Sequence, residues 1–259
     1  MNRPEWAGGN MSGHSKWATT KHRKGAKDSA RAKVFAKLIR QVEVAAREGG
    51  GDVNTNAALR TMFQKAREAS VPLDTIERAI KRGTGELEGV RYEPISYEGY
   101  GPGGVAVIVE TLTDNRNRTS AEIKHLFGKN GGAIAEPGSV SWQFDRKGVL
   151  EVAGPLDEDQ LLEWVMDAGA ENYEANGANY TVITEPHGVG SVRDALEAHG
   201  LKVTSVDLTL VPQNTIAVDD EAEAKKVLRL MDAIDDHDDV QNVYANFDIA
   251  DDLLASFEG

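Results

Sequence analysis

The chain has 259 residues, 40% of them apolar, and carries a formal net charge of -13. No stretch reaches the roughly 18 apolar residues that a membrane span needs, so we expect a cytoplasmic protein without a membrane partner. The sequence contains 0 cysteines, which excludes disulfides, thiolate catalysis and cysteine-based zinc sites.

Charge is divided unevenly along the chain. Residues 11–82 hold 16 Lys and Arg against 7 Asp and Glu, whereas residues 83–259 hold 12 against 34. This asymmetry indicates a nucleic acid or another anionic partner for the basic part. A basic helical surface that docks on the acidic remainder would explain the same composition.

The chain begins with ten residues unlike those that follow, and Met11 is the expected natural start. Residues 1–10 are therefore predicted to be a non-native or disordered extension. Residues 11–28 form a basic arm without apolar periodicity, which is typical of a segment that orders on a nucleic acid. Trp17 could stack on an unpaired base there, or it could pin the arm to a helical core.

Three short amphipathic helices follow the arm. The apolar spacing predicts helices over residues 29–48, from about residue 54, and from a cap at Asp74 to Gly83. In the first helix Lys33, Lys37 and Arg40 recur at helical spacing beside the apolar stripe. Residues 83–89 then have the composition of a linker.

The rest of the chain alternates between strand and helix patterns. Residues 104–112 predict a buried strand, a capping box at Thr119 predicts a helix, and residues 139–145 predict a strand. Residues 146–212 follow the order β-α-β-β-α-β, the ferredoxin-like split motif. Residues 214–249 again predict β-α-β.

This order predicts an α+β fold in which one ferredoxin-like unit is inserted into another. We expect three domains, the second of them discontinuous: residues 11–83 (arm and helical bundle), residues 90–145 with 213–259, and residues 146–212.

A second basic cluster lies at a predicted strand-to-helix turn, where Arg116 and Arg118 flank Asn117. Free N–H groups at a helix N-terminus attract anions, and two arginines beside them favour a phosphate contact. Local pairing with Asp114 would be the simpler role for these arginines.

An acidic run at residues 235–239 contains four carboxylates and one histidine. It could bind a divalent cation, as a metal-dependent nuclease would require, but a solvated charge run fits this acidic half better. The glycine-rich residues 97–104 lack the GK[ST] of a phosphate loop. No catalytic constellation or metal site is assigned, no cofactor is expected, and we expect a protein that is not an enzyme.

Long stretches of the chain resemble a known family. "SGHSKWATTKHRKGAKDSARAKVFAKL" is similar to the opening signature of the YebC family, "YEGYGPGGVAVIVETLTDNRNRT" to its second signature and "GSVSWQFDRKG" to its third. The resemblance extends from Met11 to the C-terminus. The family pattern begins at Met11, so residues 1–10 depart from it, and "WATTKHRKG" varies slightly after Trp17.

The resemblance implies a helical N-terminal domain and two α+β domains, one discontinuous. Family members are described as transcriptional regulators that bind DNA, and others as translation factors that relieve ribosome stalling at proline-rich stretches. One mitochondrial member activates translation of a cytochrome oxidase subunit. The resemblance carries no catalytic triad or metal site.

A translation factor that contacts RNA and the ribosome is the function we expect, with a DNA-binding transcriptional regulator as the alternative. Ribosomal RNA offers phosphates and unstacked bases to a basic arm, and a helix clearly suited to reading DNA is not evident. We expect a monomer with nucleic acid, and ribosomal proteins, as partners. The predicted nucleic-acid contacts are Lys16, Trp17, Lys21, His22, Arg23, Lys24, Lys27, Arg31, Lys33, Lys37, Arg40, Arg116, Asn117 and Arg118.

Overall fold

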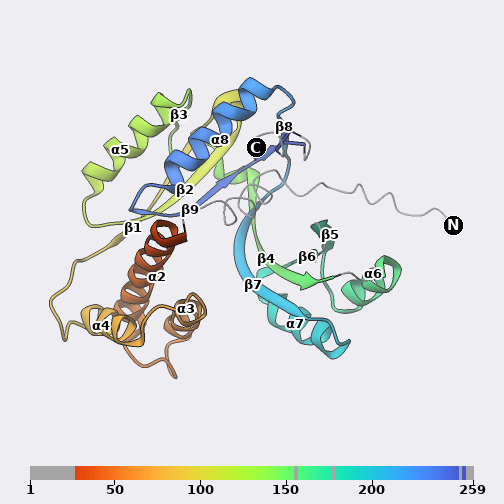
Figure 1. The fold of residues 1–259 in the computed structure, drawn as a ribbon, viewed down its shortest axis with the longest axis horizontal. Coiled ribbons are helices and arrows are strands. Elements are labelled where there is room, and N and C mark those ends of the chain that lie inside the picture. Colours follow the sequence, from red (N-terminus) through yellow and green to blue (C-terminus); the bar gives the residue numbers. More distant parts are fainter. Residues whose placement is uncertain (1–26, 155–156, 177–178, 251–252, 255–259) are drawn as a thin grey trace. The chain divides into compact units, whose positions relative to one another are not determined.

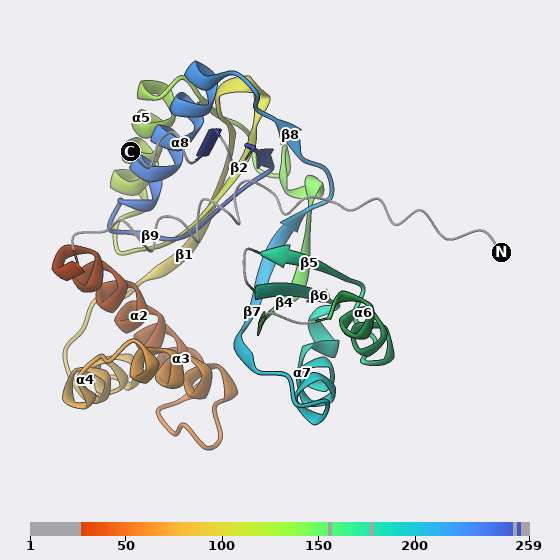
Figure 2. The same cartoon turned by 45° about the vertical axis from the view of Figure 1, so that its right-hand side comes forward.

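The computed structural model describes residues 27–154, 157–176, 179–250 and 253–254. These residues form two compact units (Figures 1 and 2). The first unit contains residues 27–139 and 222–243, and the second contains residues 140–221 and the chain from residue 244 onward. Within the described part, no helix is long and apolar enough to cross a membrane.

Three helices open the first unit: α2 (Lys27–Gly49), α3 (Ala57–Glu68) and α4 (Leu73–Thr84). The predicted apolar positions build their shared core, with Val42, Leu59 and Ile76 fully buried. Asn56 caps α3 by accepting a hydrogen bond from the Leu59 amide, and the same side chain donates to the carbonyls of Ala45 and Gly50. One side chain therefore ends α2 and begins α3.

A four-stranded sheet completes the first unit, with strand order β3-β1-β2-β9. Its strands are β1 (Glu93–Tyr100), β2 (Ala106–Thr113), β3 (Ala133–Ile134) and β9 (Val240–Ala245). The helices α5 (Arg116–Lys129) and α8 (Glu221–Asp235) run along one face of it in both views (Figures 1 and 2). The turn after α8 leads directly into β9 and is the acidic run noted in the sequence.

The second unit has the predicted β-α-β-β-α-β order. It contains β4 (Phe144–Ala153), α6 (Glu158–Asp167), β5 (Asn172–Asn176), β6 (Asn179–Thr184), α7 (Val189–Ala198) and β7 (Val203–Pro212). All pairings in the sheet are antiparallel, and the strand order is β5-β6-β4-β7, as the ferredoxin-like motif requires. A small separate sheet pairs β8 (Ile216–Ala217) with β10 (Phe247–Asp248).

The predicted α+β fold class is confirmed, whereas several element predictions were wrong. Residues 93–100 form β1, which the sequence analysis missed because the glycine-rich stretch beside it indicates turns. The strand expected at residues 139–145 is a short 3-10 helix at Ser141–Gln143 followed by the start of β4. The α5 helix begins before Thr119, because Asn115 accepts the capping hydrogen bond from the Arg118 amide. The three-domain division remains a prediction.

Candidate nucleic-acid interface

The basic arm cannot be placed, because its predicted contacts lie outside the described residues. These are Lys16, Trp17, Lys21, His22, Arg23 and Lys24. Lys27 opens α2, but its side chain is not described. Arg31 is exposed one turn later on α2, with its guanidinium 5.4 Å from the ring centre of Phe35.

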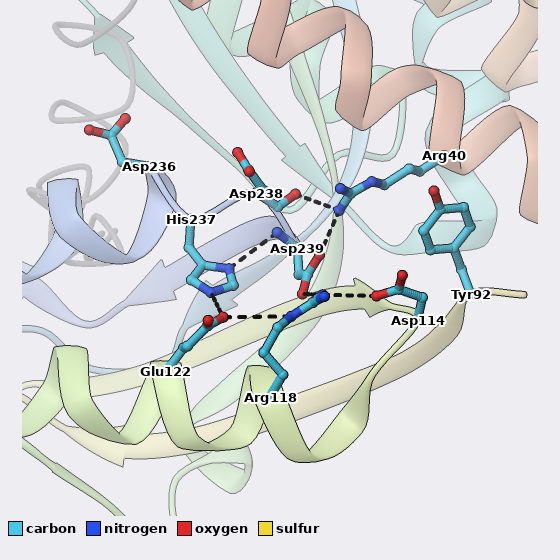
Figure 3. Close-up of a pocket in the computed structure, with 9 residues that line it drawn as sticks. All are labelled: Arg40, Tyr92, Asp114, Arg118, Glu122, Asp236, His237, Asp238 and Asp239. Carbon is cyan, nitrogen blue, oxygen red and sulfur yellow. Dashed lines mark hydrogen bonds and ion pairs between the residues drawn. The ribbon is translucent and has the colours of Figure 1, made fainter. Parts of the chain in front are cut away.

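The other predicted cations of α2 all face the acidic turn, the name used here for residues 235–239. The ammonium of Lys33 lies 2.9 Å from the Asp236 carboxylate, and that of Lys37 lies 2.8 Å from the Asp235 carboxylate. Arg40 completes the row one turn further along the helix (Figure 3). The sequence treated the turn as a solvated run, whereas it is the docking partner of a basic helix.

Asp239 is the centre of this junction and is only 3% exposed. Its Oδ1 accepts a hydrogen bond from Arg40 Nη1 at 3.0 Å. Its Oδ2 accepts one from Arg118 Nη2 at 2.7 Å and one from Thr119 Oγ1 at 2.7 Å (Figure 3). Because Arg40 belongs to α2 and Arg118 to α5, one carboxylate joins the helical bundle to the sheet-bearing part of the unit.

Electrostatics keep this carboxylate ionised. Burial by itself raises the pKa of Asp239, but the hydrogen bonds from Thr119 and Arg118 and the charges of Arg118 and Arg40 outweigh burial and hold it below its usual range. The same contact with Asp239 raises the pKa of Arg118. A buried carboxylate with these partners is satisfied on both oxygens.

A second layer of contacts surrounds Asp239. His237 Nε2 lies 2.8 Å from Glu122 Oε2, and the Asp239 amide donates to His237 Nδ1 at 3.1 Å. Since Nδ1 accepts this hydrogen bond, the proton lies on Nε2 and is donated to Glu122. The guanidinium of Arg40 lies 5.3 Å from the ring centre of Tyr92.

An open pocket of about 530 Å³ lies over this junction (Figure 3). Two arginines and five carboxylates line it, with His237 and Tyr92, so its charge does not favour an anion. Glu122, His237 and Asp239 offer donor atoms within 4.8 Å of one another. A cation there would have to break the Glu122–His237 contact and displace the cations on Asp239, so the residues fit a structural junction better than a metal site.

The predicted phosphate contact at α5 divides into two parts. Arg118 pairs with Asp114 at 2.8 Å as well as with Asp239, which is the local pairing considered as its simpler role. Arg116 and Asn117 are exposed in the first turn of the helix. Among the described residues Arg116 has no ion pair, so it and Asn117 are the part of this cluster open to a ligand.

The candidates for reading DNA bases are engaged on α3. Arg60 donates to the carbonyls of Val53 and Asn54, and the Gln64 amide donates to Glu68 at 3.1 Å. Arg67 is exposed on this helix. Side chains held by local bonds are poor readers of base edges.

Sequence reasoning missed Tyr92, Glu122, His237 and Asp239 as partners of the predicted cations. The acidic run itself was visible, but its contacts join residues about 200 positions apart, such as Arg40 and Asp239. Helical spacing identified the basic row on α2 correctly, and no local pattern shows what that row faces.

Comparison with known proteins gives two family models that together cover most of the chain. Residues 15–86 match the TACO1/YebC protein N-terminal domain, and residues 92–247 match the TACO1/YebC second and third domain. The first match coincides with the basic part of the chain.

Curated relatives and a solved structure agree with these models. A "Probable transcriptional regulatory protein" of Halothermothrix orenii is 53% identical over 247 residues, which are 94% of this chain and 98% of the relative. One of Acidithiobacillus ferrooxidans is 53% identical over 96% of this chain and 99% of its own length. The crystal structure of a conserved hypothetical protein from Aquifex aeolicus matches with a TM-score of 0.77 and 44% identity, over 86% of this chain and 93% of that one. The chain therefore belongs to the TACO1/YebC family.

Proposed function

We propose that this chain is a nucleic-acid-binding regulator of gene expression that acts on RNA at the ribosome, as a translation factor that relieves stalling at proline-rich stretches. It uses no catalytic step of its own. The observation that carries this proposal is the separation of charge. Net positive charge is confined to residues 11–82, which coincide with the N-terminal family domain, while the remainder is strongly acidic.

Several exposed cations support a phosphate-binding role for the described helices. Arg67 on α3 and Arg78 and Lys81 on α4 are exposed and have no ion pair among the described residues, and the same is true of Arg116 on α5. Cations without an internal partner are available to neutralise phosphates. The arm extends the same charge toward the N-terminus, and Trp17 adds a ring on which a base could stack.

RNA is favoured over a specific DNA site by the state of α3. Two of its three candidate base-reading side chains, Arg60 and Gln64, are bonded within the helix region itself. Contacts made by cations to phosphates do not depend on sequence, and they suit the crowded backbone of ribosomal RNA.

Sedimentation of cell lysate tests the proposal. We expect the protein to travel with ribosomes on a sucrose gradient and to leave that fraction after RNase treatment. The triple variant Lys21→Ala, Arg23→Ala, Lys24→Ala should lose the association. The matched control removes three exposed cations outside the basic part, Arg146, Lys202 and Lys226, and should keep it.

DNA-binding transcriptional regulation is the second candidate, because the curated relatives carry that name. A protein that stays at the top of the gradient, with and without RNase, would overturn the ribosome proposal. Chromatin immunoprecipitation would then be expected to recover it on defined DNA segments.

A further inference from the structure

Three cations of α2 form a row against the acidic turn, and their burial increases along the helix. The side chains of Lys33 and Asp236 are 43% and 61% exposed, and those of Lys37 and Asp235 are 19% and 26% exposed. Arg40 pairs with the buried Asp239 and also donates to the carbonyl of Asp238 at 2.6 Å. The buried end is built to stay closed, whereas the exposed end is of the kind that opens readily.

Lys33 and Lys37 also lie on the helix that continues the basic arm. Residues of one face recur every three or four positions, so both lysines share a face of α2, and Arg40 follows on it. A nucleic acid that follows the arm onto α2 would meet ammonium groups already neutralised by the carboxylates of Asp236 and Asp235.

We propose that the acidic turn occupies the place of phosphates on α2 and limits nucleic-acid binding by this helix until it is displaced. This inference, the α2 latch, rests on the proposed function and concerns the regulation of that same site. In the closed state Lys33 and Lys37 contribute no phosphate contacts. Opening releases them while the Arg40–Asp239 contact keeps α2 attached to the sheet-bearing part.

The latch explains why a row of cations expected to bind phosphate is fully paired inside the protein. Bound nucleic acid must compete with two carboxylates, so the free energy of breaking two ion pairs is subtracted from the binding free energy. Exposed or half-buried pairs are weak enough for that competition to succeed.

Neutral variants of the turn test the latch with a control at almost the same place. Asp236→Asn removes the partner of Lys33, and Asp235→Asn removes that of Lys37. Asp238→Asn removes the same unit of charge from an exposed side chain of the same turn that has no ion pair among the described residues. Binding of each full-length variant to a fluorescent oligouridine is followed by anisotropy over a range of salt concentrations.

We expect Asp236→Asn to bind oligouridine up to about fivefold more tightly than Asp238→Asn, and the double variant Asp235→Asn/Asp236→Asn up to about tenfold. The double variant should also show a steeper dependence of log K on log salt, by about 1.4, because two further lysines reach phosphates. Acetylation of Lys33, mapped by mass spectrometry, gives a second readout that needs no ligand. It should be faster in Asp236→Asn than in Asp238→Asn.

Two results overturn different parts of the argument. If the wild type binds oligouridine but Asp236→Asn matches Asp238→Asn in both affinity and Lys33 acetylation, the latch is wrong and the proposed function stands. If neither the wild type nor the double variant binds oligouridine, while both remain folded by circular dichroism, the RNA-binding function fails and the latch fails with it.

Discussion

Asp239 shows how much one side chain can determine in this protein. It lies at the start of β9, is buried, and accepts hydrogen bonds from Arg40, Arg118 and Thr119. Thr119 Oγ1 lies 2.6 Å from Thr113 Oγ1, so the contacts continue to the end of β2. Removing the charge would leave two guanidinium groups facing a neutral amide in a partly buried place.

We therefore expect Asp239→Asn to lower the free energy of unfolding by about 2–3 kcal/mol, because charged hydrogen bonds to a buried carboxylate are lost. Urea unfolding followed by circular dichroism measures the change. Asp238→Asn, one residue away and exposed, should change it by less than about 0.5 kcal/mol. Equal effects of the two variants would mean that Asp239 is not the centre of the junction.

The pKa of Asp239 predicts the dependence of stability on pH. Its partners hold the folded-state pKa below the unfolded value, which lies near about 3.9. The folded state is therefore stabilised by the ionised form above that value, and this stabilisation is lost as pH falls through the folded pKa. Urea unfolding between pH 7 and pH 3 should show a shallower acid loss in Asp239→Asn than in the wild type. Identical acid slopes would contradict the prediction.

At the scale of elements, α2 and α4 cross at a point that admits only glycine. A Cβ on Gly83 would overlap the Glu43 carbonyl oxygen and lie 2.8 Å from Ala46 Cβ. Nearby, the Glu43 carboxylate accepts hydrogen bonds from Arg82 at 2.8 Å and Arg47 at 3.4 Å. The close backbone approach and the ion pairs fix how the two helices meet.

Gly83→Ala should destabilise the protein by about 2–3 kcal/mol, although alanine has the higher helix propensity, because the crossing must open. Gly128→Ala, in α5, is the matched control: nothing lies within 4 Å of its added Cβ. That change should stabilise by about 0.5–1 kcal/mol. Thermal unfolding measures both, and a stable Gly83→Ala would show that the helices are not held this closely.

At the scale of the whole molecule, charge separation controls which part can approach a nucleic acid. The part from residue 83 onward holds 34 acidic residues against 12 basic ones, so it repels phosphates. Binding should then depend on the basic part alone and be strongly sensitive to salt.

Removing arm cations should reduce that sensitivity in proportion. For Lys21→Ala, Arg23→Ala, Lys24→Ala we expect the slope of log K against log salt for oligouridine to become shallower by about 2, since each phosphate contact contributes about 0.7. The control without Arg146, Lys202 and Lys226 should keep the wild-type slope. An unchanged slope in the arm variant would exclude the arm from the interface.

The sequence by itself determined the elements whose pattern is local. Helical spacing placed the stripe with Val42 and the basic row with Lys33, and the order of strands and helices predicted the ferredoxin-like unit, because these periods follow from backbone geometry. It failed for β1, where glycine-rich composition outweighed a strand that its neighbours β2 and β3 define.

Only the tertiary structure decided what the predicted charges face. Lys37 and Asp235 are far apart in the chain, and only the packing of α2 beside the end of α8 brings them within 2.8 Å. Local patterns report the face on which a residue lies, whereas an ion pair depends on the distance between two elements. The fold thereby joined a basic row and an acidic run that the sequence presented as separate features.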